Sequence, residues 1–492
     1  MRNMSRRMFA AVTAGAVVGT LGLAGAGAPL AAGAPHAAGP AAAPGTQLWV
    51  SRYNGPGHDF DEAAAVATSP DGQTVFVTGS STGAGPSSTS QYATIAYQAS
   101  TGAQRWVRRY DNPGGTVDNV VSMAVSSGGL VFVTGWSSGA GPGGIATVAY
   151  SAATGAFQWA ALYQAPRGED VSSMAVSPDG NTVFITGTRF RGGSESDYLT
   201  VAYRAATGAQ LWVRRYRGDS SGFNGAASVA VSPSGRTVFV TGASNRGRKG
   251  NSNSDYATVA YRAATGARLW VSRYNGPPDG NDSAAAVVPS TDGRMVFVTG
   301  SSAQRPGHLR NGDYATVAYR AATGARVWVR RYNGPGNRDD AAAAVVPSPD
   351  GTAVFVTGTS AGIHSHEDWA TVAYRAATGA RLWVKRHDGS VSSVDGATSL
   401  AVSPGGTTVF VTGDSWLGSP QDRTAASEYV TIAYRAATGA RLWARHYQNG
   451  SADQAGAVSV AVSPAGLVFV TGTSQQDNFF GDRDYATIAY SG

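Results

Sequence analysis

Short apolar runs separated by turn residues recur along nearly the whole chain. The pattern Val-Phe-(Val/Ile)-Thr-Gly occurs eight times, at intervals of 52 to 59 residues. Its copies begin at Val75, Val131, Val183, Val238, Val296, Val354, Val409 and Val468. A repeat of this length has to be interpreted before any single motif, because it defines one structural unit that the chain copies.

The copy at residues 340–387 shows the pattern within one unit. Its four apolar runs, which we name strands A to D, are residues 341–348, 353–358, 369–374 and 380–387. Each run is too short for a helix, and together they are rich in Val, Thr, Tyr and Trp, which favour strands. Tight-turn sequences, ending in Gly351 and Gly379, separate A from B and C from D.

The ends of the chain complete one another. Residues 46–53 resemble a D strand with no A, B or C before it, and residues 485–490 resemble a C strand with no D after it. Joined, they complete an eighth unit. Four antiparallel strands repeated around an axis form a β-propeller, which removes most exposed sheet edges. The sequence therefore predicts an all-β, eight-bladed β-propeller of four-stranded antiparallel blades, closed by the N-terminal strand.

Two sets of aromatic residues recur once per unit. The D strands carry Trp49, Trp106, Trp159, Trp212, Trp270, Trp328, Trp383 and Trp443. The C strands end in Tyr97, Tyr150, Tyr203, Tyr261, Tyr319, Tyr374, Tyr434 and Tyr490. Large aromatic residues at one register in every blade are best explained by packing between neighbouring blades. We expect both sets to be structural.

The N-terminal residues 1–34 predict an export signal. Arg6 and Arg7 precede Phe9 and a Gly- and Ala-rich apolar run, and the stretch resembles a twin-arginine signal, which exports folded proteins. A membrane anchor is the alternative, but such a run is a poor one. We expect cleavage between Ala26 and Ala34, a flexible linker at 35–45, the propeller at 46–492, and a secreted protein.

Composition excludes several classes of function and of site. Without the three arginines of the signal, the net charge falls from +7 to +4, which is too small to indicate nucleic acid. Cysteine is absent, which excludes disulfides and thiolate metal sites. No later segment is long and apolar enough for a membrane span, and we expect a monomer.

The segment from Ala202 to Trp212 (AYRAATGAQLW) resembles the tryptophan-docking motif of pyrroloquinoline-quinone (PQQ) dehydrogenases. Ala202, Thr207, Gly208 and Trp212 match that motif, whereas Arg204 stands at its aspartate position. The whole unit resembles a bacterial β-propeller repeat of secreted and surface proteins within the PQQ-like eight-bladed superfamily. The resemblance implies either a quinoprotein or an assembly or binding scaffold. Quinoprotein enzymes hold their cofactor beside a vicinal disulfide, so for this cysteine-free chain we expect no cofactor.

The B–C and D–A loops lie on one face of a propeller and carry nearly all of the variation between copies. Variable loops on a rigid scaffold are the usual place for recognition, so we assign the ligand to this face. Its candidate residues form a basic arc and an aromatic group within an acidic arc. The basic candidates are Arg189, Arg191, Arg246, Arg248, Lys249, Arg305 and Arg310, and the aromatic candidates are Trp416, Phe479 and Phe480.

Three further sets are weaker candidates. His364, His366 and His387 are residue types that bind divalent metals, although no third ligand is defined for the His-x-His pair. Asp368 and its equivalents Asp197, Asp255, Asp313 and Asp484 are expected to accept hydrogen bonds from loop amides. Strand A begins with an acidic residue in most copies. These residues could ring the mouth of the central channel and bind a cation, but their regular recurrence favours pairing with the arginine near the end of strand D or capping of the turn. This set is Asp61, Asp118, Asp170, Asp282, Asp340 and Asp395.

No nucleophile elbow, P-loop or zincin motif occurs. We therefore expect a secreted, non-enzymatic propeller that binds a protein or glycan partner, in the cell envelope or the medium, through the B–C and D–A loops. The alternative is an exported enzyme on the same fold, either a PQQ-type oxidoreductase or a polysaccharide-active hydrolase or lyase.

Overall fold

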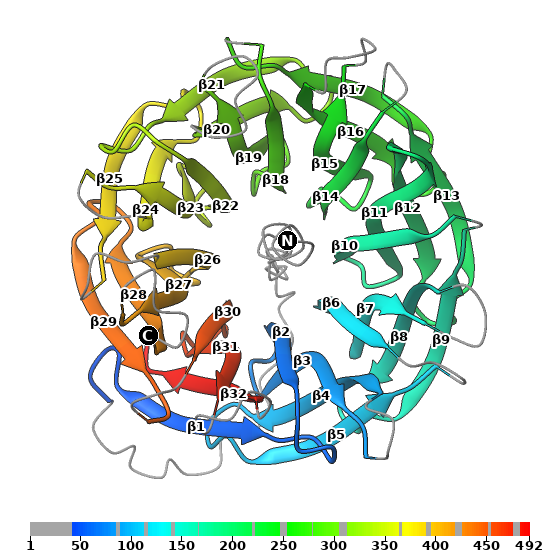
Figure 1. Cartoon of the computed structure of the whole chain (residues 1–492), viewed down its shortest axis with the longest axis vertical. Helices are drawn as coiled ribbons and strands as arrows, with labels where there is room; N and C mark the ends of the chain where they lie inside the picture. The colour runs from blue at the N-terminus through cyan, green and yellow to red at the C-terminus, as the bar shows by residue number, and fades with distance from the viewer. Residues whose placement is uncertain are drawn as a thin grey trace, which may run out of the picture.

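Eight four-stranded antiparallel sheets surround a central axis in the computed structural model (Figure 1). The structure describes residues 42–84, 89–112, 117–138, 143–165, 167–218, 222–246, 253–277, 279–304, 312–363, 367–389, 395–418, 426–450, 454–475 and 483–492. The predicted eight-bladed β-propeller is confirmed. Within these ranges, no helix has the length and apolarity that crossing a bilayer requires.

Every blade has the same strand order from the axis to the rim. The innermost A strands are β2 (Asp61–Thr68), β6 (Asp118–Val125), β10 (Glu169–Val176), β14 (Asn224–Val231), β18 (Asp282–Pro289), β22 (Asp340–Pro347), β26 (Asp395–Val402) and β30 (Gly456–Val462). The B strands are β3 (Thr74–Thr82), β7 (Leu130–Ser137), β11 (Thr182–Gly192), β15 (Thr237–Asn245), β19 (Met295–Ala303), β23 (Ala353–Ala361), β27 (Thr408–Trp416) and β31 (Val468–Gln475).

The C strands are β4 (Ser90–Gln98), β8 (Gly144–Ser151), β12 (Glu195–Arg204), β16 (Ser254–Arg262), β20 (Gly312–Arg320), β24 (Glu367–Arg375), β28 (Ser427–Arg435) and β32 (Arg483–Tyr490). The outermost D strands are β5 (Gln104–Tyr110), β9 (Phe157–Tyr163), β13 (Gln210–Tyr216), β17 (Arg268–Tyr274), β21 (Arg326–Tyr332), β25 (Arg381–His387), β29 (Arg441–Tyr447) and β1 (Gln47–Tyr53). We number the blades 1 to 8 from the one that begins with β2; blade 8 contains β30, β31, β32 and β1.

The glycine of the repeated Val-Phe-Val-Thr-Gly pattern permits an irregularity in strand A. In blade 5 the register between β18 and β19 shifts between Ala284 and Ala286, opposite Gly300. A Cβ atom on Gly300 would overlap the backbone carbonyl oxygen of Ser283. In every other blade, a Cβ atom on the equivalent glycine would overlap the equivalent carbonyl oxygen of strand A. The glycine is therefore required by a β-bulge in the adjacent strand.

The other residues of the pattern fill the space between blades. In blade 5, Val296, Phe297 and Val298 are all fully buried, because each sheet has another blade on both of its faces. Thr299 is also buried, and its hydroxyl lies 3.0 Å from the hydroxyl of Thr316 on strand C. The same threonine pair occurs in all eight blades, so a polar residue is tolerated here because its partner is another buried hydroxyl.

The D-strand tryptophans join each blade to the next, as expected. Trp270 of blade 4 donates an indole N–H bond of 2.9 Å to the carbonyl of Ala321 in blade 5, and its ring lies 6.4 Å from that of Tyr319. The turn glycine of blade 5, Gly324, packs against the same indole. Its backbone φ is +71°, a conformation that favours glycine. Within one Thr-Gly-x-x-x-Trp motif, the glycine therefore contacts the preceding blade and the tryptophan contacts the following blade.

The N-terminal strand closes the ring. β1 pairs antiparallel with β32 over the register from Gln47–Tyr490 to Tyr53–Tyr485. Gly45 donates a 2.8 Å bond to the carbonyl of Ser491 and has a φ of +77°, which reproduces the C–D turn of the other blades from two separate chain ends. The Trp443 indole of blade 7 packs on Gly45 as the other tryptophans pack on their turn glycines.

Candidate functional site

The B–C hairpin of blade 3 is longer than its counterparts. β11 and β12 stay paired as far as Gly192 and Glu195. Gly192 and Gly193 have φ values of +104° and +60°, so the two glycines form the tight turn. A segment that the sequence placed in a variable loop is therefore mostly strand, and it carries two of the predicted basic residues.

Three arginines of blade 3 gather around the buried carboxylate of Asp197. The guanidinium groups of Arg189, Arg191 and Arg217 lie 3.8, 3.3 and 3.8 Å from its oxygens. Arg191 also pairs with Glu195 on the other strand of the hairpin. The predicted candidates Arg189 and Arg191 are thus only about 20% exposed, and their charge is largely compensated within the blade.

Arg246 occupies a similar position in blade 4. Its guanidinium lies 3.3 Å from the buried Asp255, which Arg273 also approaches at 3.2 Å, and 2.7 Å from Asp279. Arg246 is half exposed. The prediction that this face is basic needs qualification in blades 3 and 4, because each described candidate arginine is already paired with an acid.

The C-strand aspartates have a different role from the one predicted. Asp255, Asp313, Asp368 and Asp484 each accept a bond from the guanidinium of the D-strand arginine of the same blade. The expected hydrogen bonds to loop amides are not their main interaction. The prediction was wrong because the D strand brings a guanidinium against each carboxylate, and burial makes that pairing compulsory.

In blade 6 the arginine also links neighbouring blades. Arg386 donates to Asp368 at 2.6 Å, to the Ser360 carbonyl at 2.8 Å, and to the Tyr332 hydroxyl of blade 5 at 3.0 Å. This arrangement explains why the D strands so often end in Arg-Tyr. These bonds hold neighbouring blades together at the loop face.

The acidic residues of strand A cap the D–A loops. Asp282 and Asp340 accept bonds of 2.6 and 2.7 Å from the amides of Gly276 and Gly334. The capping alternative is confirmed for these residues, while the D-strand arginines pair with the C-strand aspartates. Burial raises the pKa of Asp340 and Asp395 to about 6.

Blade 3 differs from the predicted capping residue by one position. Glu169, not Asp170, occupies the register of the other capping residues. It accepts a 2.8 Å bond from the Ala165 amide. Burial raises the pKa of Glu169 to about 7. Glu169 thus caps from the same register, and its donor amide lies four residues before it, where the donor to Asp282 lies six residues before.

The predicted metal ligands are only partly within the described residues. His364 and His366 lie outside them. The His387 ring is mostly buried, 5.2 Å from the Trp369 ring, and burial together with nearby His446 lowers its pKa. No three His, Cys, Asp or Glu side chains of the described ranges are arranged to hold an ion. The three-histidine site stays a prediction.

The aromatic group within the acidic arc is similarly divided. Trp416 ends β27, opposite Ser427, and is partly buried. Nearby Asp414 has a pKa raised to about 7, chiefly by burial. Phe479 and Phe480 lie outside the described residues, as do the basic candidates Arg248, Lys249, Arg305 and Arg310. Their roles also stay predictions.

Four exposed apolar side chains mark the loop face. Phe60, Val117 and Phe223 lie in D–A loops, and Ile363 lies in a B–C loop. They are 49%, 38%, 45% and 62% exposed. The other large apolar side chains that are exposed in the described ranges belong to the outer D strands. Sequence reasoning missed the four residues because they are single positions outside any periodic run.

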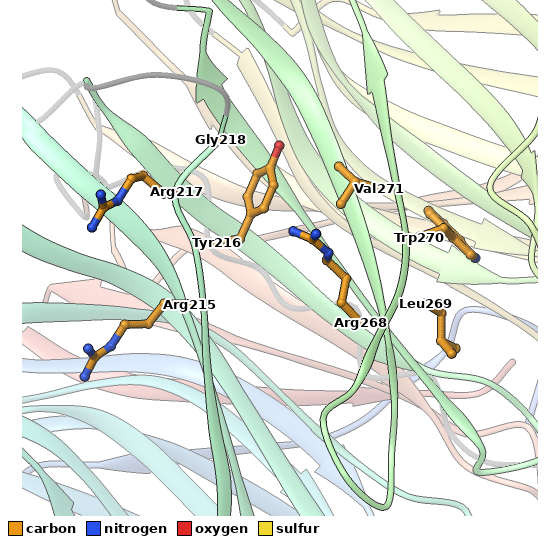
Figure 2. A pocket seen from close by; sticks show the side chains of 8 residues that line it. All are labelled: Arg215, Tyr216, Arg217, Gly218, Arg268, Leu269, Trp270 and Val271. Atoms are coloured by element: carbon orange, nitrogen blue, oxygen red, sulfur yellow. The ribbon is translucent and has the colours of Figure 1, made fainter.

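A groove of about 660 Å³ lies on the outer side, between the D strands of blades 3 and 4. Arg215, Tyr216 and Arg217 line it from the end of β13, and Arg268 and Leu269 line it from the start of β17. Figure 2 shows the Arg268 side chain extending toward the β13 strand. Because the groove joins two blades, no single sequence segment indicates it.

Solved structures with a similar fold belong to propellers of several functions. Sqt1 from Chaetomium thermophilum, bound to the N-terminus of the ribosomal protein L10, is 12% identical over 88% of this chain and 97% of its own, with a TM-score of 0.53. The quinohemoprotein alcohol dehydrogenase ADHIIG from Pseudomonas putida HK5 is 15% identical over 91% and 76%, with a TM-score of 0.51. BamB from Moraxella catarrhalis is 15% identical over 91% and 97%, with a TM-score of 0.46.

These structural likenesses concern the fold alone, and no curated protein sequence matches the chain significantly. A family model described as outer membrane protein assembly factor BamB matches residues 37–246 and 255–476. The chain therefore belongs to the BamB family of PQQ-like β-propellers.

Proposed function

We propose that this protein is an exported scaffold that binds a protein partner through its B–C and D–A loop face. The observation that carries the proposal is the placement of Phe60, Val117, Phe223 and Ile363, which are exposed on that face of a rigid ring. Exposed aromatic and aliphatic side chains next to arginines have the composition of protein-binding surfaces.

The strongest part of this surface is at blades 3 and 4, and we name Arg217, Phe223 and Arg246 the blade 3–4 patch. The Phe223 carbonyl accepts a 3.0 Å bond from the Asn245 amide of β15, so the backbone beneath its ring is fixed. Arg217 and Arg246 are 66% and 50% exposed. An exposed aromatic side chain on the same face as two partly exposed guanidiniums fits a partner surface with apolar and acidic residues better than it fits a neutral glycan.

The family and fold support a scaffold. The family description names an assembly factor, and Sqt1 with the same type of fold is bound to a segment of another protein. In the described ranges of this chain, the inward-facing carboxylates cap loops or pair with arginines, as described above. These carboxylates stabilise the fold, so we assign partner recognition to the loops.

The residues present do not fit a quinone cofactor of the kind that the resemblance implies. The chain has no cysteine for a vicinal disulfide. The described ranges bring no three acidic or histidine side chains together as calcium ligands. An exported enzyme therefore remains the less supported alternative. Mixing the purified protein with PQQ and Ca²⁺ tests it: a stoichiometric absorbance change would favour an enzyme over a scaffold.

Capture of a partner tests the proposed face. The tagged protein is incubated with envelope and medium fractions of the producing cells, and retained proteins are identified. The triple variant Arg217→Gln, Phe223→Ser, Arg246→Gln should lose a specific partner that the unaltered protein retains. A control with Arg236→Gln and Arg294→Gln, in A–B turns of the opposite face, should retain it. Equal loss in both variants would contradict the face assignment, and retention of glycans alone would contradict a protein partner.

Export is tested separately. Replacing Arg6 and Arg7 by Lys should keep the protein inside the cell if the twin-arginine interpretation of residues 1–34 is right. Unchanged appearance of the variant in the medium would contradict it.

A further inference from the structure

The outer strands of five consecutive blades expose an aliphatic residue beside the docking tryptophan. The residue precedes the tryptophan directly, at the start of strand D, and is 40% to 44% exposed. In blades 3 to 7 these residues are Leu211, Leu269, Val327, Leu382 and Leu442, and Leu48 of blade 8, at the same position, is 38% exposed. Their regular recurrence shows that the exposure is a property of the rim and not of one loop.

The same corner of each of these blades is basic. An exposed arginine ends strand C in blades 3 to 7, at Arg204, Arg262, Arg320, Arg375 and Arg435. A second exposed arginine begins strand D in blades 4 to 7, at Arg268, Arg326, Arg381 and Arg441. We name these arginines and the five aliphatic residues the C–D rim.

The charge of the C–D rim is not compensated by acids in the described ranges. None of its nine arginines lies within salt-bridge distance of a described carboxylate, whereas Arg189, Arg191 and Arg246 on the loop face are all paired. The C–D turns themselves contain no acidic residue. The side opposite the variable loops therefore presents nine exposed arginines without an ion-pair partner in the described ranges, although its A–B turns also carry exposed acids such as Asp292 and Asp350.

The C–D rim is also level. In blades 3 to 7 the turn glycine has a φ between +66° and +71°, and its amide donates a bond of 2.8 to 2.9 Å to the carbonyl of the C-strand arginine. Since the blades repeat around one axis (Figure 1), we expect equal turns to bring the five arginine and aliphatic groups to similar heights along it. The loops of the other face differ in length and cannot form such a plane.

A concavity is present where the rim begins. The groove between blades 3 and 4 has a volume of about 660 Å³, and no carboxylate lines it (Figure 2). Arg268 and Leu269 line it at the rim, where they combine a site for an anionic headgroup with an adjacent apolar contact, and Arg215 and Arg217 line it from the loop-face end of β13.

We propose that the C–D rim docks this protein on the surface of a bilayer that contains anionic lipid. Guanidinium groups bind lipid phosphates through paired N–H donors. Leucine and valine side chains beside them enter the boundary between headgroups and acyl chains. A soluble polyanion would satisfy the arginines but would leave the aliphatic side chains exposed, and it would not require them to be level. The bilayer accounts for all three features.

This docking leaves the loop face pointing away from the bilayer. The proposal does not depend on the partner proposed above, since it involves the opposite corner of each blade. Loss of lipid binding and loss of partner capture are therefore separable outcomes.

Vesicle sedimentation of the chain without residues 1–34 tests the proposal. The protein should sediment with vesicles of phosphatidylcholine and phosphatidylglycerol and stay in solution with phosphatidylcholine alone. The variant Arg326→Gln, Arg381→Gln, Arg441→Gln should bind the anionic vesicles about tenfold more weakly. A control of equal charge, Arg167→Gln, Arg246→Gln, Arg338→Gln on the loop face and outside the groove, should bind as the unaltered protein does.

The aliphatic residues separate a bilayer from a soluble polyanion. Changing Leu269, Val327, Leu382 and Leu442 to Ser should weaken vesicle binding about tenfold and leave binding to dextran sulfate unchanged. The chain has no native cysteine, so Val327→Cys carries a single polarity-sensitive dye whose emission should shift to the blue on anionic vesicles. Binding to dextran sulfate without binding to vesicles, or an unshifted dye on bound protein, would overturn the proposal.

Discussion

Gly45 lies against the indole ring of Trp443, at the point where the two ends of the propeller meet. A Cβ atom on Gly45 would be 2.8 Å from that ring. The contact joins a residue before the first strand to the last docking tryptophan along the chain, and it repeats the glycine–tryptophan contact of the seven continuous C–D turns. The ring is therefore closed by the same interaction that stacks its blades.

Gly45→Ala should be more destabilising than Gly129→Ala, which is its matched control. The two glycines have φ values of +77° and +78°, but Gly129 has no atom within 4 Å of the added Cβ. Both variants bear the conformational cost of about 1–2 kcal/mol. Only Gly45→Ala must also displace an indole, for a further loss of about 1–3 kcal/mol. Denaturant unfolding measures both, and equal losses would contradict closure through Trp443.

Gly300→Ala tests the explanation of the repeated Thr-Gly. The added Cβ would overlap the Ser283 carbonyl oxygen, and a backbone atom in a central sheet cannot move aside easily. We expect a loss of about 3 kcal/mol in the free energy of unfolding. Gly312→Ala in the same blade, whose nearest contact would be 3.4 Å away, should change stability by less than about 1 kcal/mol. If Gly300→Ala is equally mild, the bulge does not require glycine.

Asp340→Asn should reduce the dependence of stability on pH. Burial raises the pKa of Asp340 to about 6 from 3.8, so between these values the folded state binds more protons than the unfolded state. The stabilisation from the protonated form is complete below about pH 4 and is lost as the pH rises through 6. The neutral amide cannot lose it. The variant should gain about 1–2 kcal/mol relative to the unaltered protein on going from pH 4 to pH 7.5.

Blade 4 provides the precedent for that substitution, because Asn224 stands opposite Ser244 where Asp340 stands opposite Ser360. Asparagine therefore fits this position of the fold. Denaturant midpoints of both proteins across the pH range give the comparison. A stability difference that does not vary with pH would show that Asp340 does not titrate as proposed.

Removing either partner of the Arg386–Asp368 pair should cost about 3–5 kcal/mol, because each change leaves the other group buried with less compensation. The two groups are 2.6 Å apart, and their side chains are 21% and 6% exposed. The double variant Arg386→Ala, Asp368→Ala should be less destabilised than the sum of the single variants by at least about 1 kcal/mol. Strict additivity of the three unfolding free energies would show that the pair is not coupled.

The fold could be predicted because local and long-range requirements coincide in every copy. Gly324 ends a C–D turn and also receives the Trp270 indole of the preceding blade, so one short pattern reports both the turn and the stacking. The two incomplete units at the chain ends indicated the closure by β1 in the same way. What the pattern did not reveal was the reason for the glycine after Thr299, since the bulge opposite it lies in another strand.

The site could be predicted less well because its interactions cross between strands and blades. Arg189 and Arg191 were chosen as accessible charges, yet the paired hairpin of blade 3 brings both to Asp197. The uniform C–D turns were set aside as architecture, although Arg326 and Val327 are exposed together there. Repetition identified the scaffold shared by all blades correctly. A surface that repeats in several blades, such as the C–D rim, can nevertheless have a function.

Site-specific photocrosslinking in the producing cells tests the central claim, that the loop face binds a protein partner, most directly. A benzophenone amino acid replaces Phe223 on that face and, in a second strain, Arg236 in the exposed A–B turn of the same blade. The account predicts one covalent protein adduct of discrete mass from position 223 and none from position 236. Adducts of equal mass and yield from both positions, or from position 236 alone, would contradict it.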